Sequence, residues 1–267
     1  MPRTREYVAE FAGTFLMLLI GLSAVTVMFA TSSPVVRWVP SEDVRRLITG
    51  TVFAGGATLI VYSPIGKTSG GHLNPAVTLA MRRMGKMTPR GAAGYVAAQL
   101  AGALAGAAVV RVAWGSLADD VRVGATRPGI GGWPWSVVAE VAFTFVLVGL
   151  ILRFVDRPAL MRFTPLAAGS LVATLVFVAA PVSGTSLNPA RSLGPAVVAG
   201  LLDDLWIYVL APVTGALLAV AVYRRKRRGV RCGKLVHDDR YECRFLDCRY
   251  TPPSRRLPSM QEMDRVT

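Results

Sequence analysis

Charged side chains are scarce in this sequence. Asp, Glu, Lys and Arg together make up 17% of the 267 residues, whereas hydrophobic residues make up 52% and the mean hydropathy is +0.45. A soluble domain of this size needs considerably more polar surface than that. The composition therefore excludes an ordinary soluble protein and favours one that lies in a lipid bilayer.

Cysteine and histidine are also rare. The three cysteines, Cys232, Cys243 and Cys248, all lie beyond residue 230, and His237 lies among them. An odd number of cysteines in one polar segment does not form a disulfide framework. The apolar part of the chain contains one histidine, His72. This part of the chain has no cluster of metal-binding residues and no convincing nucleophile–base pair. We therefore expect no enzyme, no resident metal and no cofactor.

Acidic residues are outnumbered by basic ones. The sequence has 30 Lys and Arg against 16 Asp and Glu, which gives a formal net charge of +14. In a soluble protein this excess would suggest nucleic acid as the partner. Here most of the basic residues flank apolar runs, so they are better explained as signals of membrane orientation, and no nucleic-acid partner is expected.

Six apolar runs are long enough to cross roughly 30 Å of hydrocarbon as helices. Lipid offers no hydrogen-bond partners to a free backbone, so all six are predicted to be helical. The first run is followed by five others and is not a cleaved signal peptide. Two further apolar stretches, 74–84 and 188–200, are too short to cross. The predicted spans are residues 7–30, 44–64, 90–114, 134–154, 163–181 and 204–223.

Basic residues gather on one side of these spans. With both termini in the cytoplasm, the clusters all fall on the cytoplasmic side, as Lys and Arg do in membrane proteins. We expect a multi-pass protein of a plasma membrane or a bacterial inner membrane. The clusters are Arg3 and Arg5, then Arg82, Arg83, Lys86 and Arg90, then Arg153, Arg157 and Arg162, and finally the run at 224–228.

The chain repeats internally. AEFAGTF at 9–15 recurs as AEVAFTF at 139–145, and SGGHLNPAVT at 69–78 recurs as SGTSLNPARS at 183–192. Each repeat contains three spans, an odd number, so the second copy must enter the membrane from the opposite side. We predict a channel domain at 1–223, with repeat one at about 5–115 and repeat two at about 133–223.

Each of the two short stretches begins with Asn-Pro-Ala. Asn is a favoured helix cap, and Pro fits the first helical position because its missing N–H costs nothing there. Two half-length helices that enter from opposite faces would meet N-terminus to N-terminus near the midplane. Each end carries roughly half a positive charge, which repels cations. The capping amides of Asn74 and Asn188 can donate hydrogen bonds into a lumen.

These segments resemble the two signature loops of the aquaporin (major intrinsic protein) family, and the sequences at 9–15 and 139–145 resemble its repeated first-helix motif. The resemblance covers about residues 5–223. It implies an all-α membrane protein with six transmembrane helices and two re-entrant half-helices around one pore, usually assembled as a homotetramer. The implied function is passive passage of water, with small neutral solutes as an open addition, and exclusion of ions and protons. The motif residues are Asn74, Pro75, Ala76, Asn188, Pro189 and Ala190.

The same resemblance assigns four selectivity-filter positions, Phe53 (or a neighbour of it), Val176, Thr185 and Arg191. Water-selective members usually carry His where Val176 stands, so its loss predicts a wider opening for glycerol, urea or metalloid acids. Ser192, Ala196 and Tyr208 are instead typical of water channels. The segment 178–196 is similar to the plant nodulin-like members, and the solute remains open between these classes.

Three charged residues lie at membrane depth, where charge is costly and usually functional. The resemblance makes Arg191 the constriction arginine and gives Glu10 and Glu140 the task of bracing the two re-entrant loops. The alternative for the glutamates is a proton relay in a coupled secondary transporter. For His72 we expect loop packing, with its backbone carbonyl toward the pore; a titrating gate is the alternative.

The last segment, 224–267, is predicted to be a disordered cytoplasmic tail whose basic start contacts anionic lipid. Its cysteines have the pattern Cys-x10-Cys-x4-Cys, with His237 nearby. Zinc binding is an alternative for these residues, but the spacing is not that of a standard site, so no metal is predicted there.

Overall fold

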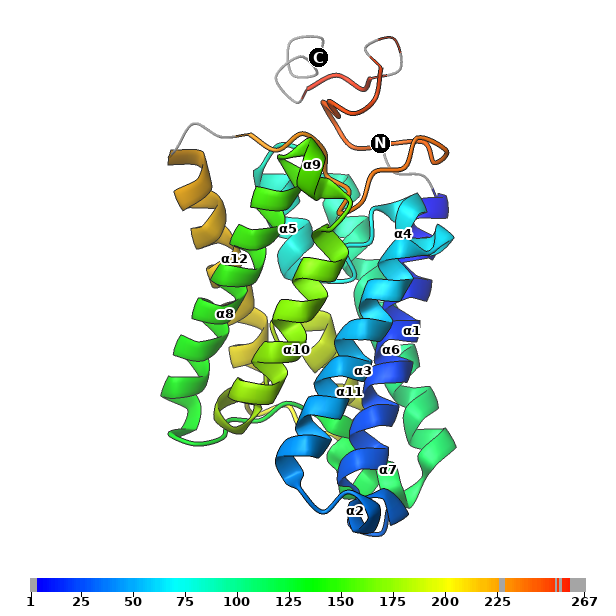
Figure 1. The fold of residues 1–267 in the computed structure, drawn as a ribbon, viewed down its shortest axis with the longest axis vertical. Helices are drawn as coiled ribbons and strands as arrows, with labels where there is room; N and C mark the ends of the chain where they lie inside the picture. Colours follow the sequence, from blue (N-terminus) through cyan, green and yellow to red (C-terminus); the bar gives the residue numbers. More distant parts are fainter. Residues whose placement is uncertain (1–3, 226–228, 253, 255, 260–267) are drawn as a thin grey trace.

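The protein is described here from a computed structural model, which describes residues 4–225, 229–252, 254 and 256–259. Arg3 and residues 226–228 of the predicted basic clusters lie outside these ranges. Among the described residues, six helices are long and apolar enough to cross a membrane, and they run alongside one another (Figure 1). They are α1 (Thr4–Phe29), α3 (Glu42–Tyr62), α6 (Pro89–Trp114), α8 (Gly132–Val155), α10 (Thr164–Ser183) and α12 (Leu205–Arg225).

The six predicted spans match these helices, with ends that differ by at most three residues. The predicted all-α class with six spans is therefore confirmed. The prediction missed short helices in the connections, each about one turn long and without apolar periodicity. Three of them begin with a proline at the first turn, a signal that was present in the sequence. They are α2 (Pro34–Trp38), α4 (Pro64–Ser69), α7 (Ser116–Asp120), η1 (Arg122–Gly124) and α9 (Pro158–Met161).

The two short apolar stretches form the half-length helices α5 (Pro75–Arg83) and α11 (Pro189–Ala199). Both begin where the sequence predicts. The Asn74 side chain accepts from the backbone N–H of Ala76 at 2.9 Å, and the Asn188 side chain accepts from that of Ala190 at 3.0 Å. Each asparagine thus satisfies an N–H that the first helical turn leaves without a backbone partner.

The two halves of the molecule pack in the same way. Helix α1 packs along α6, and α8 packs along α12, the corresponding pair in the second half. Glycines permit both close crossings. A Cβ on Gly102 of α6 would lie 2.4 Å from the carbonyl oxygen of Phe11, and a Cβ on Gly215 of α12 would lie 2.3 Å from that of Val141. Small residues at helix crossings in membranes allow backbones to approach in this way.

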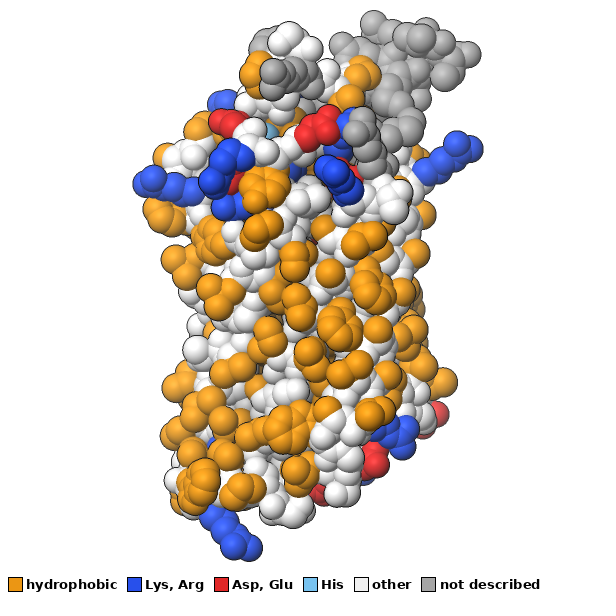
Figure 2. Space-filling view, turned by 90° about the vertical axis from the view of Figure 1, so that its right-hand side faces the viewer, with side chains coloured by type: hydrophobic (Ala, Val, Ile, Leu, Met, Phe, Trp, Pro, Cys, Tyr) orange, Lys and Arg blue, Asp and Glu red, His pale blue; other side chains and the backbone are white. Residues whose placement is uncertain are grey.

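Hydrophobic side chains cover the middle of the surface, whereas the charged side chains on the same face gather at its two ends (Figure 2). Leu59, Val112 and Val178 are among the large apolar side chains that are exposed on the long helices. An exposed apolar surface of this extent requires lipid around it. The chain is therefore an integral, multi-pass membrane protein.

Helix α1 begins and α12 ends at the same end of the bundle, which we call the terminal face (Figure 1). Residues 229–252 follow α12 there and pack against this face without forming helix or strand. Val230, Cys232, Leu235 and Phe245 of this segment are buried. Parts of the predicted tail, at 226–228, 253, 255 and 260–267, lie outside the described residues.

Candidate pore

The loop before α5 is held by Glu10 of α1. One carboxylate oxygen, Oε1, accepts from the backbone N–H of His72 at 3.0 Å, and the other, Oε2, accepts from that of Leu73 at 2.8 Å. Leu73 has a φ of 49°, in the left-handed region. For a residue with a Cβ, this conformation is less stable than the right-handed one by roughly 1–2 kcal/mol. The carboxylate supplies the partners that hold the loop in this strained path.

Glu140 of α8 holds the loop before α11 in the same manner. Its Oε1 accepts from the backbone N–H of Ser186 at 2.8 Å, and its Oε2 accepts from that of Leu187 at 2.7 Å. Leu187 also has a left-handed φ, of 55°. The third donor differs between the halves, because the Ser183 hydroxyl bonds Glu140 whereas the side-chain amide of Gln99 bonds Glu10. Both carboxylates are buried and fully engaged with protein donors.

The strained loops also join the two halves. The Asn74 amide nitrogen donates to the carbonyl oxygen of Leu187 at 2.9 Å, and the Asn188 amide nitrogen donates to that of Leu73 at 2.8 Å. An asparagine amide has two hydrogens, so each side chain keeps one for another acceptor. The N-termini of α5 and α11 therefore meet inside the protein, with their positive ends toward each other.

Two cavities adjoin inside the helix bundle. The outer cavity, of about 390 Å³, opens toward the face opposite the terminal face, and Phe29, Glu42 and Val121 line part of it. The inner cavity, of about 120 Å³, contains Asn74 and Asn188 in its wall. Residues that line both cavities mark the place where they adjoin: Phe53, Val172, Ser186 and Arg191.

The four residues assigned to the filter lie together. Phe53, Val176, Thr185 and Arg191 all line the outer cavity, and Phe53 and Arg191 also reach the inner one. The guanidinium carbon of Arg191 lies 5.5 Å from the centre of the Phe53 ring. Two of these side chains are apolar and two are polar, so this part of the outer cavity has walls of both kinds.

Arg191 is held by a residue that the sequence analysis did not single out. Its Nη1 donates to the carbonyl oxygen of Gly124, the last residue of η1, at 2.8 Å. A guanidinium has five N–H donors, so others are left to face the cavities. Ser192, the next residue, takes part in a chain of hydroxyls that links it to Thr126 at 2.6 Å and to Ser186 at 2.6 Å. These contacts fix the first turn of α11, which carries the arginine, against the neighbouring loops.

The His72 ring is engaged at both nitrogens. Its Nε2 lies 2.9 Å from the carbonyl oxygen of Gly233, and a carbonyl can only accept, so Nε2 carries a hydrogen. Its Nδ1 lies 3.1 Å from the Thr78 hydroxyl. This bond ties the loop before α5 to the tail. A second tail residue, Leu235, lines the inner cavity itself. No sequence signal pointed to either contact.

A family model described as "Major intrinsic protein" matches residues 1–223. The chain is 38% identical over 226 residues to aquaporin NIP3-1 of Arabidopsis thaliana, an alignment that covers 82% of this chain and 66% of that protein, just under two thirds of its length. It is also 38% identical over 220 residues to glycerol uptake facilitator protein-like 6 of Lactiplantibacillus plantarum, which covers 80% of this chain and 94% of that protein.

The aquaglyceroporin of Plasmodium falciparum has a similar fold, with a TM-score of 0.66 over 82% of this chain and 94% of that one. At a sequence identity of 21%, this likeness shows only that the two folds are similar. The inverted arrangement of six helices and two half-helices agrees with this likeness, and the family match covers every membrane-spanning helix up to residue 223. This chain therefore belongs to the major intrinsic protein family, a family of membrane channels rather than enzymes.

Proposed function

We propose that this chain is a passive channel for water and small neutral solutes. The observation that carries the proposal is the pair of asparagines where α5 and α11 meet. Each has one amide hydrogen bonded to the opposite half and one left over, and both side chains line the inner cavity. Water or a hydroxyl solute can accept these hydrogens, whereas the two positive helix ends repel cations and hydronium.

The constriction at Phe53, Val176, Thr185 and Arg191 acts as the selectivity filter in this proposal. A solute with a carbon face and a hydroxyl face, such as glycerol, suits a wall that is half apolar and half polar. The name of the Lactiplantibacillus relative, a glycerol uptake facilitator, supports glycerol as a candidate solute beside water. Urea and undissociated metalloid acids have similar size and polarity and belong in the same test.

Glu10 and Glu140 serve as structural braces. Each carboxylate accepts three hydrogen bonds from protein donors, and neither residue lines either cavity. A proton relay in a coupled transporter would need water or solute to reach them. This arrangement favours a passive channel over the transporter alternative.

For the orientation, we propose that the terminal face is cytoplasmic and that residues 1–223 form the channel domain. Arg82 and Arg83 end α5 on that side, and Arg153 ends α8 there. Lys and Arg are enriched on the cytoplasmic side of membrane proteins. A homotetramer in a plasma membrane or bacterial inner membrane is the expected assembly, with anionic lipid beside the basic end of α12.

The test is solute flux in proteoliposomes with and without a proton gradient. A passive channel conducts water and glycerol down their own gradients, and an imposed pH difference of two units leaves both rates unchanged, within about 20%. A glycerol flux that is driven uphill by the proton gradient would instead establish the coupled transporter.

A further inference from the structure

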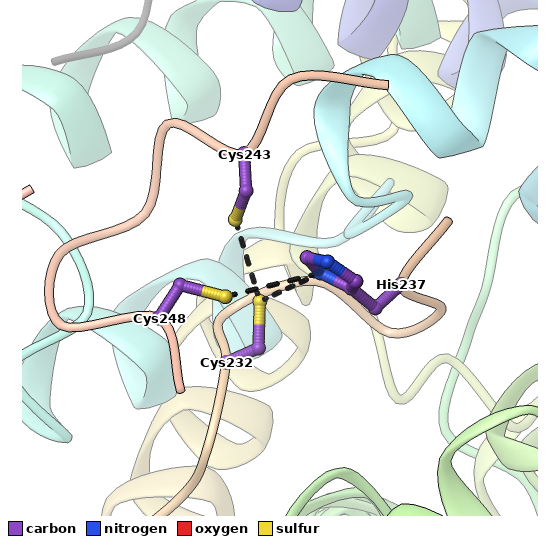
Figure 3. Close-up of side chains that lie close together, drawn as sticks. All are labelled: Cys232, His237, Cys243 and Cys248. Carbon is purple, nitrogen blue, oxygen red and sulfur yellow. Dashed lines mark hydrogen bonds between the residues drawn. The ribbon is translucent and has the colours of Figure 1, made fainter. Parts of the chain in front are cut away.

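Four side chains with metal-binding atoms converge in the tail, outside the pore (Figure 3). They are Cys232, His237, Cys243 and Cys248, and each offers one ligand atom; these atoms all lie within 4.8 Å of one another. The Cys232 sulfur lies 3.5 Å from that of Cys243 and 3.7 Å from Nδ1 of His237. The Cys248 sulfur lies 3.8 Å from the same nitrogen.

The three separations of 3.5, 3.7 and 3.8 Å are close to the edges of a zinc tetrahedron, and the 4.8 Å limit on the whole group leaves only a small adjustment for a metal to make. Bonds of about 2.3 Å to sulfur and about 2.0–2.1 Å to nitrogen place two sulfurs about 3.8 Å apart and a sulfur and a nitrogen about 3.6 Å apart. A disulfide, by contrast, needs sulfurs at about 2.05 Å and would leave the third thiol and the histidine without a role. Three cysteines and one histidine are a common ligand set for structural zinc.

The surroundings of the four residues also suit a metal. Nε2 of His237 lies 3.2 Å from a carboxylate oxygen of Asp239, so Nδ1 keeps its lone pair directed at the sulfurs. The backbone N–H of Lys234 points at the Cys232 sulfur at 3.4 Å. Hydrogen bonds of this kind to the ligating side chains orient them toward a metal. All three cysteines are buried, although residues 229–252 form no helix or strand that could build a core around them.

The loop between the first two ligands reaches the pore. It consists of residues 233–236, between Cys232 and His237. The backbone N–H of Leu235 donates to the carbonyl oxygen of Gly70 at 2.9 Å, and Gly233 accepts from the His72 ring at 2.9 Å. The Leu235 side chain lines the inner cavity on its terminal side and is buried there. The segment that the metal would shape therefore contributes to the mouth of the pore.

We propose that Cys232, His237, Cys243 and Cys248 bind one Zn²⁺, and that this zinc holds loop 233–236 at the opening of the inner cavity on the terminal face, so that Leu235 narrows the pore. The gating half of this proposal rests on the proposed channel function, whereas the zinc site does not. Zinc closes the loop by joining its two ends, Cys232 and His237, to the later cysteines.

Further contacts dock the same segment on the channel. Asp238 pairs with Lys67 of α4 at 3.1 Å, and Lys86 after α5 donates to the Asp247 carbonyl oxygen at 2.8 Å. The Phe245 ring packs beside the His72 ring, with centres 5.4 Å apart. A segment this short has too little apolar core to hold its own shape, so a structural metal supplies the folding free energy. Zinc removal is then expected to release the segment from the mouth.

The zinc site is tested by metal analysis of the full-length protein purified without added chelator. We expect about one zinc per chain in the natural protein and less than about 0.2 in Cys243→Ser and Cys248→Ser. The control Arg240→Ala changes an exposed side chain of the same segment and should keep its zinc. Absence of zinc from the natural protein, iron in its place, or undiminished zinc in both cysteine variants would overturn the site.

The gate is tested by stopped-flow water flux in proteoliposomes made from the same proteins. Removal of zinc with a chelator during reconstitution, or Cys243→Ser, should raise water flux by roughly threefold or more. Leu235→Ala should raise it similarly while the zinc content stays at about one per chain. Val236→Ala is the matched control, because Val236 is buried in the same loop but does not line the inner cavity.

The outcomes distinguish the zinc site from the gate. Unchanged flux after zinc removal and in Leu235→Ala, with zinc bound in the natural protein, would overturn the gate. Water flux that is no faster than in empty vesicles in every variant would overturn the proposed channel function and the gate together, and the measured zinc content would still decide the site. The zinc site and the gate would both be supported if water flux rises when zinc is lost and also rises in Leu235→Ala while zinc is retained.

Discussion

At the scale of single residues, the pore depends on a few side chains that compensate one another. Leu73 and Leu187 take left-handed conformations that turn their carbonyl oxygens toward the opposite asparagine. Glu10 and Glu140 hold those conformations from behind. The glutamates and asparagines were evident in the sequence from their repeated motifs. The leucine conformations were not, because they follow from the contact between the two halves.

Replacement of the Glu140 carboxylate tests this brace. Glu140→Gln offers one acceptor oxygen where the natural residue uses two, and its amide group would face a backbone N–H. An unsatisfied buried donor costs about 1–3 kcal/mol, so thermal unfolding in detergent should begin several degrees lower. Glu42→Gln, at an exposed position, is the control. Equal unfolding temperatures for the two variants would argue against the brace.

Arg191 is the residue on which selectivity should depend. Arg191→Ala removes a positive charge and several donors from the constriction and widens it, so the ratio of glycerol to water flux should rise by roughly threefold or more. Proton leakage should rise as well, because one barrier to cations is lost. Arg127→Ala removes a charge from the exposed outer loop and should change neither. An unaltered flux ratio in Arg191→Ala would remove it from the filter.

At the scale of elements, the sequence was informative wherever length and apolar character decide the outcome. The six spans and the two capped half-helices followed from run length and from Asn-Pro. Connections were less predictable. Gly124 ends η1 and accepts a hydrogen bond from Arg191, but nothing in its local sequence distinguishes it from other glycines in the connections. Such roles arise when distant loops are brought together by packing.

Glycine substitutions test the paired helix crossings. Gly102→Ala and Gly215→Ala each place a Cβ within 2.4 Å of a backbone carbonyl oxygen on the neighbouring helix. Overpacking of this kind costs about 1–3 kcal/mol, so both variants should unfold at lower temperature. Gly149→Ala in α8 meets nothing within 4 Å and should be neutral or slightly stabilising. If all three behaved alike, the crossings would not depend on these glycines.

At the scale of the whole molecule, the channel domain and the tail differ in how far sequence could predict them. The arrangement of the channel domain could be predicted from the inverted repeat, because each half contains the same motifs. The tail cysteines and His237 are spaced unlike a standard zinc motif, so the sequence alone favoured no metal. Their convergence is accompanied by contacts of the tail with Gly70, His72 and Lys86, and such tertiary contacts leave no signal in the local sequence.

The meeting of the two half-helices is tested most directly by parallel measurement of water and proton flux. In zinc-free proteoliposomes, we predict water flux roughly tenfold above that of empty vesicles with no added proton leakage, and loss of most of this water flux in Asn188→Asp. Its carboxylate cannot donate to the Leu73 carbonyl oxygen, so the junction of the halves is broken. Water flux equal to that of empty vesicles, or full flux in Asn188→Asp, would contradict the assigned pore.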